Sequence, residues 1–246
     1  SRNPAGPAFN ERRAKPPWRG ISNVDYAANF ALFLEQKPKD RPFCFWYGAH
    51  EPHRSYEAGS GIKSGKELAR AEVPPFLPDT PEVRSDLLDY AVEIEWFDHH
   101  LEQMLRLLEQ TGELDNTLII VTSDNGMPFP RAKANLYEYG IHVPLAICWP
   151  AQIPGNRIID DPVGFVDLTA TILEAAGVKH PHSEDPKLAP VGKSLLQLLR
   201  SRMQGRVDLE RRFIFAGRER HSSSRYKNLG YPCRAVRNDR FLYIRN

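Results

Sequence analysis

The chain has 246 residues, enough for one large domain or for one domain and part of a second. Its 33 basic and 31 acidic residues leave a formal net charge of +2, which is too small to indicate binding to nucleic acid or to an anionic membrane. No stretch approaches the roughly 20 apolar residues of a membrane-spanning helix, and a hydrophobic content of 41% is typical of globular proteins.

The first part of the chain predicts a helix, a strand and a long loop. Apolar residues at helical spacing over 24–36 predict a helix that stops before a proline. The run "PFCFWYGA" at 42–49 predicts a buried strand, and residues 50–78 predict a long surface loop. Cys44 in this run and Cys148 in a later apolar run are expected to be buried thiols.

A long amphipathic helix is predicted to follow. Thr80 can cap it, Pro81 suits its first turn, and the pattern continues to about Gln110. His99 and His100 fall beside the apolar stripe, so we expect them to be solvated or in a second layer. The stripe itself consists of Leu87, Tyr90, Ile94, Phe97, Leu101, Met104, Leu105 and Leu108.

The second half of the chain alternates short strands and helices. This alternation predicts an α/β fold with a mainly parallel sheet flanked by helices. Ligands of such sheets bind at the carboxyl ends of strands, so residues that follow strands are the candidates for function. The expected elements are strands at 117–122 and 142–149, helices at 167–176 and 194–199, a strand at 213–216, and a hairpin of 233–237 with 241–244.

Polar residues follow the strand at 117–122. Asp124 and Asn125 offer a carboxylate and an amide oxygen, which suit Ca²⁺ or Mg²⁺ better than Zn²⁺. Gly126 is expected to give the backbone room to turn. Arg131 and Lys133 could bind an anion. The residues alone leave open a common Asp-Asn-Gly turn followed by two solvated cations.

A second group of polar residues follows the run at 42–49. In "HEPHR", His50 and His53 could act as acid–base groups or donate hydrogen bonds to an anion. His221 comes after the strand expected at 213–216, where it could line a pocket.

In combination these motifs resemble the sulfatase family of the alkaline-phosphatase superfamily. "HEPHR" after an apolar strand, "TLIIVTSDNG" after a long amphipathic helix, and "VDLTATILEAAG" carry the resemblance, which runs from about residue 42 to the end. "NGMPFPRAKANLY" and "VPPFLPDTPEVRSDL" are most similar to the heparan N-sulfatase (sulfamidase) branch and its bacterial relatives. The resemblance implies an incomplete alkaline-phosphatase-like domain over 1–200, and the start of a smaller C-terminal subdomain over 201–246.

The resemblance also implies roles for individual residues. Asp124 and Asn125 match the pair that holds a divalent cation, usually Ca²⁺ with Mg²⁺ as the alternative. Lys133 matches a position that binds sulfate oxygen, His53 matches a histidine that contacts the sulfate or the leaving group, and Asp167 matches a structural position. The residues that we assign to substrate binding are His50, Arg54, Arg131 and His221.

One departure from the family pattern is large. Sulfatases carry a Cys or Ser in C/S-x-P-x-R, which becomes a formylglycine nucleophile, together with an Asp-Asp metal pair near the N-terminus and a Lys-x-His block after the nucleophile. None of the three occurs here. Cys148 opens a partial match, but Gln152 stands where arginine is required, and the match lies on the wrong side of "SDNG". We therefore expect a C-terminal part of a longer protein whose missing N-terminal segment supplies formylglycine.

The resulting interpretation is hydrolysis of sulfate esters or sulfamates by the longer protein, with a sulfated saccharide or small molecule as substrate. Neither a nucleic-acid partner nor a membrane span is expected. The longer protein is expected to be periplasmic or secreted, and the chain by itself is expected to be inactive. Two alternatives stay open: a phosphatase or phosphodiesterase of the same superfamily, and a non-catalytic relative that binds sulfated sugars.

Overall fold

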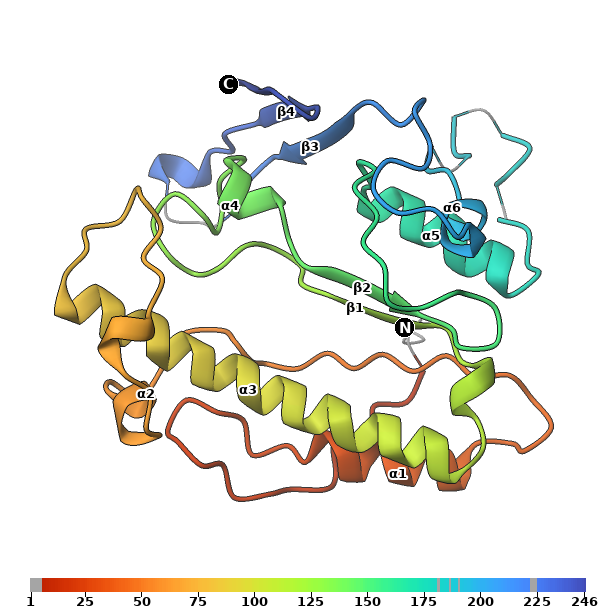
Figure 1. The fold of residues 1–246 in the computed structure, drawn as a ribbon, viewed down its shortest axis with the longest axis horizontal. Helices are drawn as coiled ribbons and strands as arrows, with labels where there is room; N and C mark the ends of the chain where they lie inside the picture. Colours follow the sequence, from red (N-terminus) through yellow and green to blue (C-terminus); the bar gives the residue numbers. More distant parts are fainter. Residues whose placement is uncertain (1–5, 181, 186, 190, 222–224) are drawn as a thin grey trace. The chain divides into compact units, whose positions relative to one another are not determined.

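The computed structural model describes residues 6–180, 182–185, 187–189, 191–221 and 225–246 (Figure 1). The chain divides into two compact units, Ser1–Glu113 and Leu114–Asn246. This division falls well before the boundary that we expected after residue 200 between a catalytic domain and a C-terminal subdomain. That functional boundary stays a prediction.

The first unit is organised around one long helix. α3 (Pro81–Gln110) begins as predicted, because the Thr80 hydroxyl accepts the N–H of Val83 at 3.4 Å and proline occupies the first turn. α1 (Tyr26–Gln36) and α2 (Ser60–Lys63) both pack against it (Figure 1). With η1 (Leu68–Arg70), α2 interrupts the segment that we expected to be a long loop.

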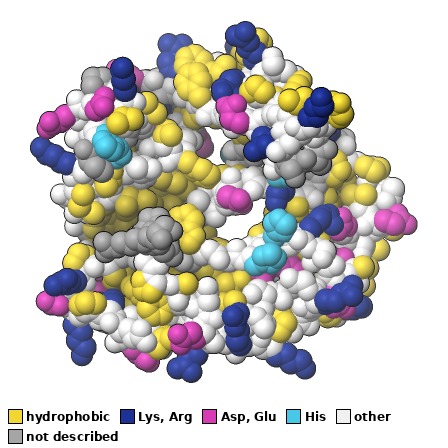
Figure 2. Space-filling model, turned by 180° about the vertical axis from the view of Figure 1, so that it is seen from behind, with side chains coloured by type: hydrophobic (Ala, Val, Ile, Leu, Met, Phe, Trp, Pro, Cys, Tyr) yellow, Lys and Arg dark blue, Asp and Glu magenta, His cyan; other side chains and the backbone are white. Residues whose placement is uncertain are grey.

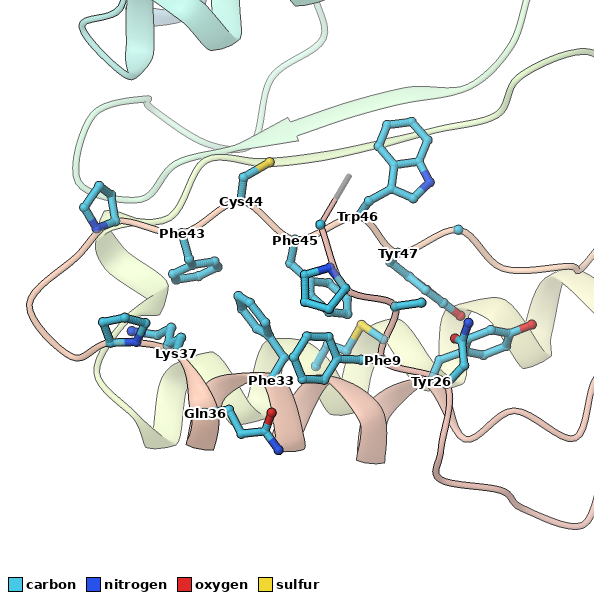
Figure 3. Close-up of a pocket in the computed structure, with 18 of the residues that line it drawn as sticks. Phe9, Tyr26, Phe33, Gln36, Lys37, Phe43, Cys44, Phe45, Trp46 and Tyr47 are labelled. Atoms are coloured by element: carbon cyan, nitrogen blue, oxygen red, sulfur yellow. The ribbon is translucent and has the colours of Figure 1, made fainter. Parts of the chain in front are cut away.

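The predicted strand at 42–49 is an extended segment that pairs with no strand in the described part of the chain. Its side chains still alternate. Phe43, Phe45 and Tyr47 are half-buried and point toward α1, whereas Cys44 and Trp46 point away and are exposed (Figure 3). Cys44 is therefore not the buried thiol that we expected, because it lies on the outward face of this alternation.

The buried side of α3 is more polar than its apolar stripe predicted. α1 packs over it, and the ring of His100 lies edge-on to Tyr26, with 5.3 Å between ring centroids. His100 is only 2% exposed, and its Nδ1 accepts the N–H of Ala27 at 3.3 Å. Of the two alternatives that we gave for these histidines, a solvated position is wrong for His100, whereas His99 is exposed. The buried residues of α3 are Leu88, Asp89, Val92, Glu93, His100, Met104 and Leu108.

The second unit contains a two-stranded sheet of β1 (Ile119–Thr122) and β2 (Leu145–Cys148). The pair is antiparallel, with Ile119 opposite Cys148 and Thr122 opposite Leu145. The expected parallel arrangement is therefore wrong for the described strand pairs, all of which are antiparallel. A parallel pair needs a crossover, usually a helix, and the chain between these strands forms only the four-residue α4 (Glu138–Ile141). Cys148 is exposed, not buried as expected.

The rest of the second unit forms a helical layer and a second sheet. α5 (Phe165–Ala175) and α6 (Leu196–Arg200) share an apolar core that includes Leu195, Leu196 and Ile153. The predicted hairpin is confirmed as β4 and β5, which join β3 in an antiparallel order β3-β4-β5. The bounds of these and the remaining elements are β3 Ile214–Arg218, β4 Cys233–Arg237, β5 Leu242–Arg245, η2 Leu114–Asn116 and η3 Tyr226–Asn228.

Charges of both signs are scattered over the face shown in Figure 2, which agrees with the small net charge. Within the described residues, no helix combines the length and apolar character that crossing a bilayer requires.

Asp167 holds the start of α5 in place. Its carboxylate accepts the N–H groups of Gly164 at 3.0 Å and Lys193 at 2.8 Å, and it forms an ion pair with Arg211 at 3.0 Å. Asp167 and the Arg211 side chain are both buried. These contacts agree with the structural role that the resemblance implied for Asp167.

We predict that Asp167→Ala lowers the free energy of unfolding by about 3 kcal/mol, because it leaves a buried guanidinium and two N–H groups without their partner. Denaturant unfolding followed by circular dichroism measures the change. Glu174→Ala, on the exposed side of the same helix, is the control and should change stability by less than about 0.5 kcal/mol. Equal losses for the two variants would contradict the assignment.

Candidate active site

The residues after β1 present hard oxygen donors. Asp124 is exposed, and Asn125 follows it in a turn that the Ser123 hydroxyl closes by donating to the Asn125 carbonyl at 2.8 Å. Carboxylate and amide oxygens suit Ca²⁺ or Mg²⁺. The described residues contain no cluster of three or more His, Cys, Asp or Glu side chains that could hold a metal. Asp124 and Asn125 can therefore supply two oxygen ligands to a hard divalent cation, which is part of the set that such an ion takes.

Gly126 is required by a close approach of two backbone segments. A Cβ on this residue would lie 1.7 Å from the carbonyl oxygen of Tyr139, and the Gly126 N–H donates to the Gly140 carbonyl at 3.1 Å. Gly140 is equally confined, since its Cβ would lie 2.3 Å from the carbonyl oxygen of Asn135. Gly126 does not have a positive φ, so what glycine provides here is room for the Tyr139 carbonyl and not freedom of φ.

The backbone of Lys133 is held on both sides. Its N–H donates to the Met127 carbonyl at 3.0 Å, and its carbonyl accepts from the Asn135 side-chain amide at 3.1 Å. The Lys133 side chain is half-buried and takes part in none of the ion pairs found among the described residues. Arg131 is exposed and lies over the ring of Tyr137 at 5.0 Å. Lys133 is thus the better placed of the two cations to act on a ligand.

The β3-β4-β5 sheet anchors this loop, a feature that the sequence did not reveal. Leu136 packs in an apolar cluster with Cys233 and Ala235 of β4. Arg237 forms a two-point ion pair with Glu138 at 2.9 and 3.2 Å, and these bonds lower the pKa of the Glu138 carboxyl. The Arg218 guanidinium also donates to the carbonyl of Ala134, next to Lys133. Contacts this distant in sequence leave no local pattern.

The "HEPHR" residues lie together in the first unit. The rings of His50 and His53 are 5.5 Å apart between centroids, and both side chains are exposed. His53 Nδ1 lies 2.6 Å from the Arg54 carbonyl oxygen, so Nδ1 carries the proton and Nε2 is left to act on a ligand. Arg54 forms a two-point ion pair with Asp86, which takes up part of the guanidinium that we assigned to substrate.

Glu51, inside the same motif, was not singled out from the sequence. It is 4% exposed and accepts the N–H of Ser22 at 2.6 Å and the hydroxyl of Tyr26 at 2.9 Å. Glu93 on α3 is a second buried carboxyl, and its Oε2 has no hydrogen-bond partner among the described residues. Burial, with the Glu51 charge as a smaller cause, raises the pKa of Glu93 from 4.5 to about 7.

The expected site residues thus fall into two groups. His50, His53 and Arg54 belong to the first unit, and Asp124 and its neighbours belong to the second. His221 is exposed beyond the end of β3. A groove of about 670 Å³ in the first unit, lined by aromatic residues such as Phe9, Phe33, Phe43 and Phe45, includes none of the expected site residues (Figure 3).

Comparison with known proteins decides the family. The sequence profile described as "Sulfatase" matches residues 2–178. The chain belongs to the sulfatase family. The resemblance stated from "HEPHR" and "TLIIVTSDNG" is therefore confirmed, and the family generally uses formylglycine and a divalent metal.

Curated relatives extend this result. An ulvan-active sulfatase of Formosa agariphila is 31% identical over 201 residues, covering 81% of this chain and 30% of that protein. Human N-sulphoglucosamine sulphohydrolase is 28% identical over 236 residues, covering 86% of this chain and 45% of that protein. This sulfatase chain spans less than half the length of either relative.

Solved structures confirm the alkaline-phosphatase-like α/β fold. A protein in complex with its substrate D-glucosamine-2-N,6-O-disulfate superposes with a TM-score of 0.67 at 19% identity, covering 89% of this chain and 59% of that one. A protein from the glycosaminoglycan metabolism of Bacteroides thetaiotaomicron gives a TM-score of 0.70 at 17% identity, covering 89% and 47%. Because these sequence identities are below 20%, the two similarities show the fold alone.

We predict that Gly126→Ala costs about 2 kcal/mol or more of stability, because the new methyl group cannot fit against the Tyr139 carbonyl. Thermal unfolding of the variant tests this. Gly155→Ala is the matched control in the same unit, since nothing lies within 4 Å of its Cβ position and its φ is not positive. A Gly126→Ala protein as stable as Gly155→Ala would show that the loop backbones do not meet as described.

We also predict that Glu93→Gln stabilises the protein at pH 8 by about 3 kcal/mol and has little effect near pH 4.5. The folded pKa of about 7 lies above the ordinary value of 4.5, so folding favours the neutral acid. This contribution is complete below pH 4.5 and is lost as the pH rises through 7. Urea unfolding at both pH values measures it, with exposed Glu109→Gln as control. An unchanged pH dependence in Glu93→Gln would rule the prediction out.

Proposed function

We propose that this chain contributes the cation-binding and sulfate-binding residues of an enzyme that hydrolyses sulfate esters or sulfamates on sulfated saccharides. The observation that carries the proposal is the placement of Asp124 and Asn125 directly after β1, with Lys133 in the loop that follows them. The names of the relatives, an N-sulphoglucosamine sulphohydrolase and an ulvan-active sulfatase, support a sulfated saccharide as substrate.

The residues supply electrostatic stabilisation in this proposal. Asp124 and Asn125 would contribute two oxygen ligands to Ca²⁺, with Mg²⁺ as the alternative, and the bound cation would withdraw charge from the sulfuryl oxygens. The Lys133 ammonium would bind one of these oxygens and stabilise the charge that develops in the transition state. His53, with Nδ1–H bonded to the Arg54 carbonyl, would use Nε2 at the sulfate or at the leaving oxygen or nitrogen.

The residues of this chain do not fit the formylglycine that the family implies. No cysteine or serine of the 246 residues stands in C/S-x-P-x-R, and the partial match at Cys148 lacks its arginine. No nucleophilic step is therefore assigned to this chain, and the chain assayed by itself should show no sulfatase turnover. In a longer protein that includes the nucleophile segment, the roles of Lys133 and His53 become testable.

We predict that Lys133→Ala in such a protein lowers kcat/KM by roughly 10²–10³-fold, because it removes one preorganised donor from the sulfuryl group. The melting temperature should barely move, since the Lys133 backbone and not its ammonium holds the loop. Hydrolysis of a chromogenic aryl sulfate and of N-sulfated glucosamine measures the effect, with the 246-residue chain as background.

Two further variants sharpen this test. Arg131→Ala should be milder, because Arg131 is exposed and stacks on Tyr137. Lys133→Arg should keep more activity than Lys133→Ala, since it retains the positive charge. Equal activity of wild type and Lys133→Ala would overturn the role of Lys133 and make Arg131 the candidate.

A further inference from the structure

One hydroxyl group connects α1 to both residues that open "HEPHR". The Tyr26 hydroxyl donates to Glu51 Oε2 at 2.9 Å and accepts the backbone N–H of His50 at 3.0 Å. The other oxygen of Glu51 accepts the N–H of Ser22 at 2.6 Å. Tyr26 and Glu51 are buried, whereas the His50 side chain is exposed. A buried network thus ends at the backbone of an exposed candidate site residue.

The network extends to His53. The His53 N–H donates to the His50 carbonyl at 3.0 Å, so His50 is bonded through its N–H to Tyr26 and through its carbonyl to His53. The loop between them has no helix or ladder of its own. Without the Tyr26 hydroxyl, the position of the loop from His50 to His53 would depend on fewer contacts with distant residues.

The Tyr26 side chain that anchors the loop is closely packed. The Tyr26 ring contacts Tyr47 at 5.2 Å and His100 at 5.3 Å between centroids, and Tyr26 lies in the first turn of α1. Burial is the main cause that raises the pKa of the Tyr26 hydroxyl above its ordinary value of 10, so the proton that it donates to Glu51 is retained near neutral pH. The hydroxyl therefore keeps both its donor and its acceptor role.

We propose that Tyr26 and Glu51 are positioning residues that hold the His50–His53 loop in the geometry needed at the sulfated substrate. Neither residue touches the substrate in this account, since both act through the backbone of His50. The role rests on the proposed function, because it assumes that His53 acts at the sulfate or at the leaving group. It assigns a purpose to the one residue of "HEPHR" that is buried among exposed or partly exposed neighbours.

Tyr26→Phe tests the positioning pair by removing one oxygen atom and leaving the ring. Tyr47→Phe is the matched control, because its ring packs against Tyr26 but its hydroxyl donates to the Phe97 carbonyl on α3 at 3.2 Å. In amide hydrogen exchange followed by NMR, the His50 N–H should be protected in wild type and in Tyr47→Phe. It should exchange at least tenfold faster in Tyr26→Phe.

The kinetic arm uses the longer protein that contains the nucleophile segment. Tyr26→Phe should lower kcat about tenfold or more, with a smaller change in KM, since a displaced loop misplaces His53 in the transition state. Tyr47→Phe should stay within about twofold of wild type. The kcat of Glu51→Gln should lie between those of Tyr26→Phe and Tyr47→Phe. This variant keeps one acceptor oxygen for Ser22 or Tyr26 and loses the other.

The outcomes separate the two proposals. Loss of His50 protection with unchanged kcat would overturn the positioning role and leave the proposed function standing. Unchanged His50 protection in Tyr26→Phe would overturn the hydrogen-bond network itself. Absence of sulfatase turnover in the wild-type longer protein would overturn the proposed function, and with it the positioning role, whatever the exchange data show.

Discussion

Both loops that carry the candidate chemistry depend on the requirement that buried backbone groups be hydrogen-bonded without the help of regular secondary structure. In the second unit, Gly126 and Gly140 allow two backbone segments to approach within hydrogen-bonding distance, and the Lys133 backbone is bonded on either side. In the first unit, a tyrosine hydroxyl and a buried carboxylate replace the missing ladder bonds. These contacts restrain each loop while the candidate side chains of His53 and Asp124 stay exposed.

Distant parts of the chain also help to hold the loop that carries Lys133. Arg218 and Arg237 come from the β3-β4-β5 sheet, yet both end on the loop that carries Lys133. Lys133 would be less well placed without this sheet, although the strands themselves carry none of the proposed chemistry. A substitution in the C-terminal strands can therefore change the position of Lys133 through the loop.

Two buried titratable groups of the first unit, Glu93 and His100, make the stability of the fold depend on pH. Glu93 is favoured as the neutral acid, and burial, as the main cause, lowers the pKa of His100, so His100 is favoured as the neutral base. Raising the pH destabilises the fold through Glu93, and lowering it destabilises the fold through His100. The two effects therefore act in opposite directions, and both groups lie among the buried residues of α3, against which the helix that carries Tyr26 packs.

The sequence by itself determined the family, the long helix from Pro81, the hairpin of β4 and β5, and the candidate residues after β1 and after the extended segment at 42–49. These features depend on local signals: a capping threonine, period-two alternation, and short motifs such as "SDNG" and "HEPHR". Tertiary structure decided what local signals do not encode. The direction of β2 against β1, the burial of His100 and Glu51, the reason for Gly126, and the arginines that hold the Lys133 loop all depend on which distant segments come together. Hydrogen bonds and steric limits between such segments, up to 99 residues apart for Glu138 and Arg237, leave no periodic trace in the chain.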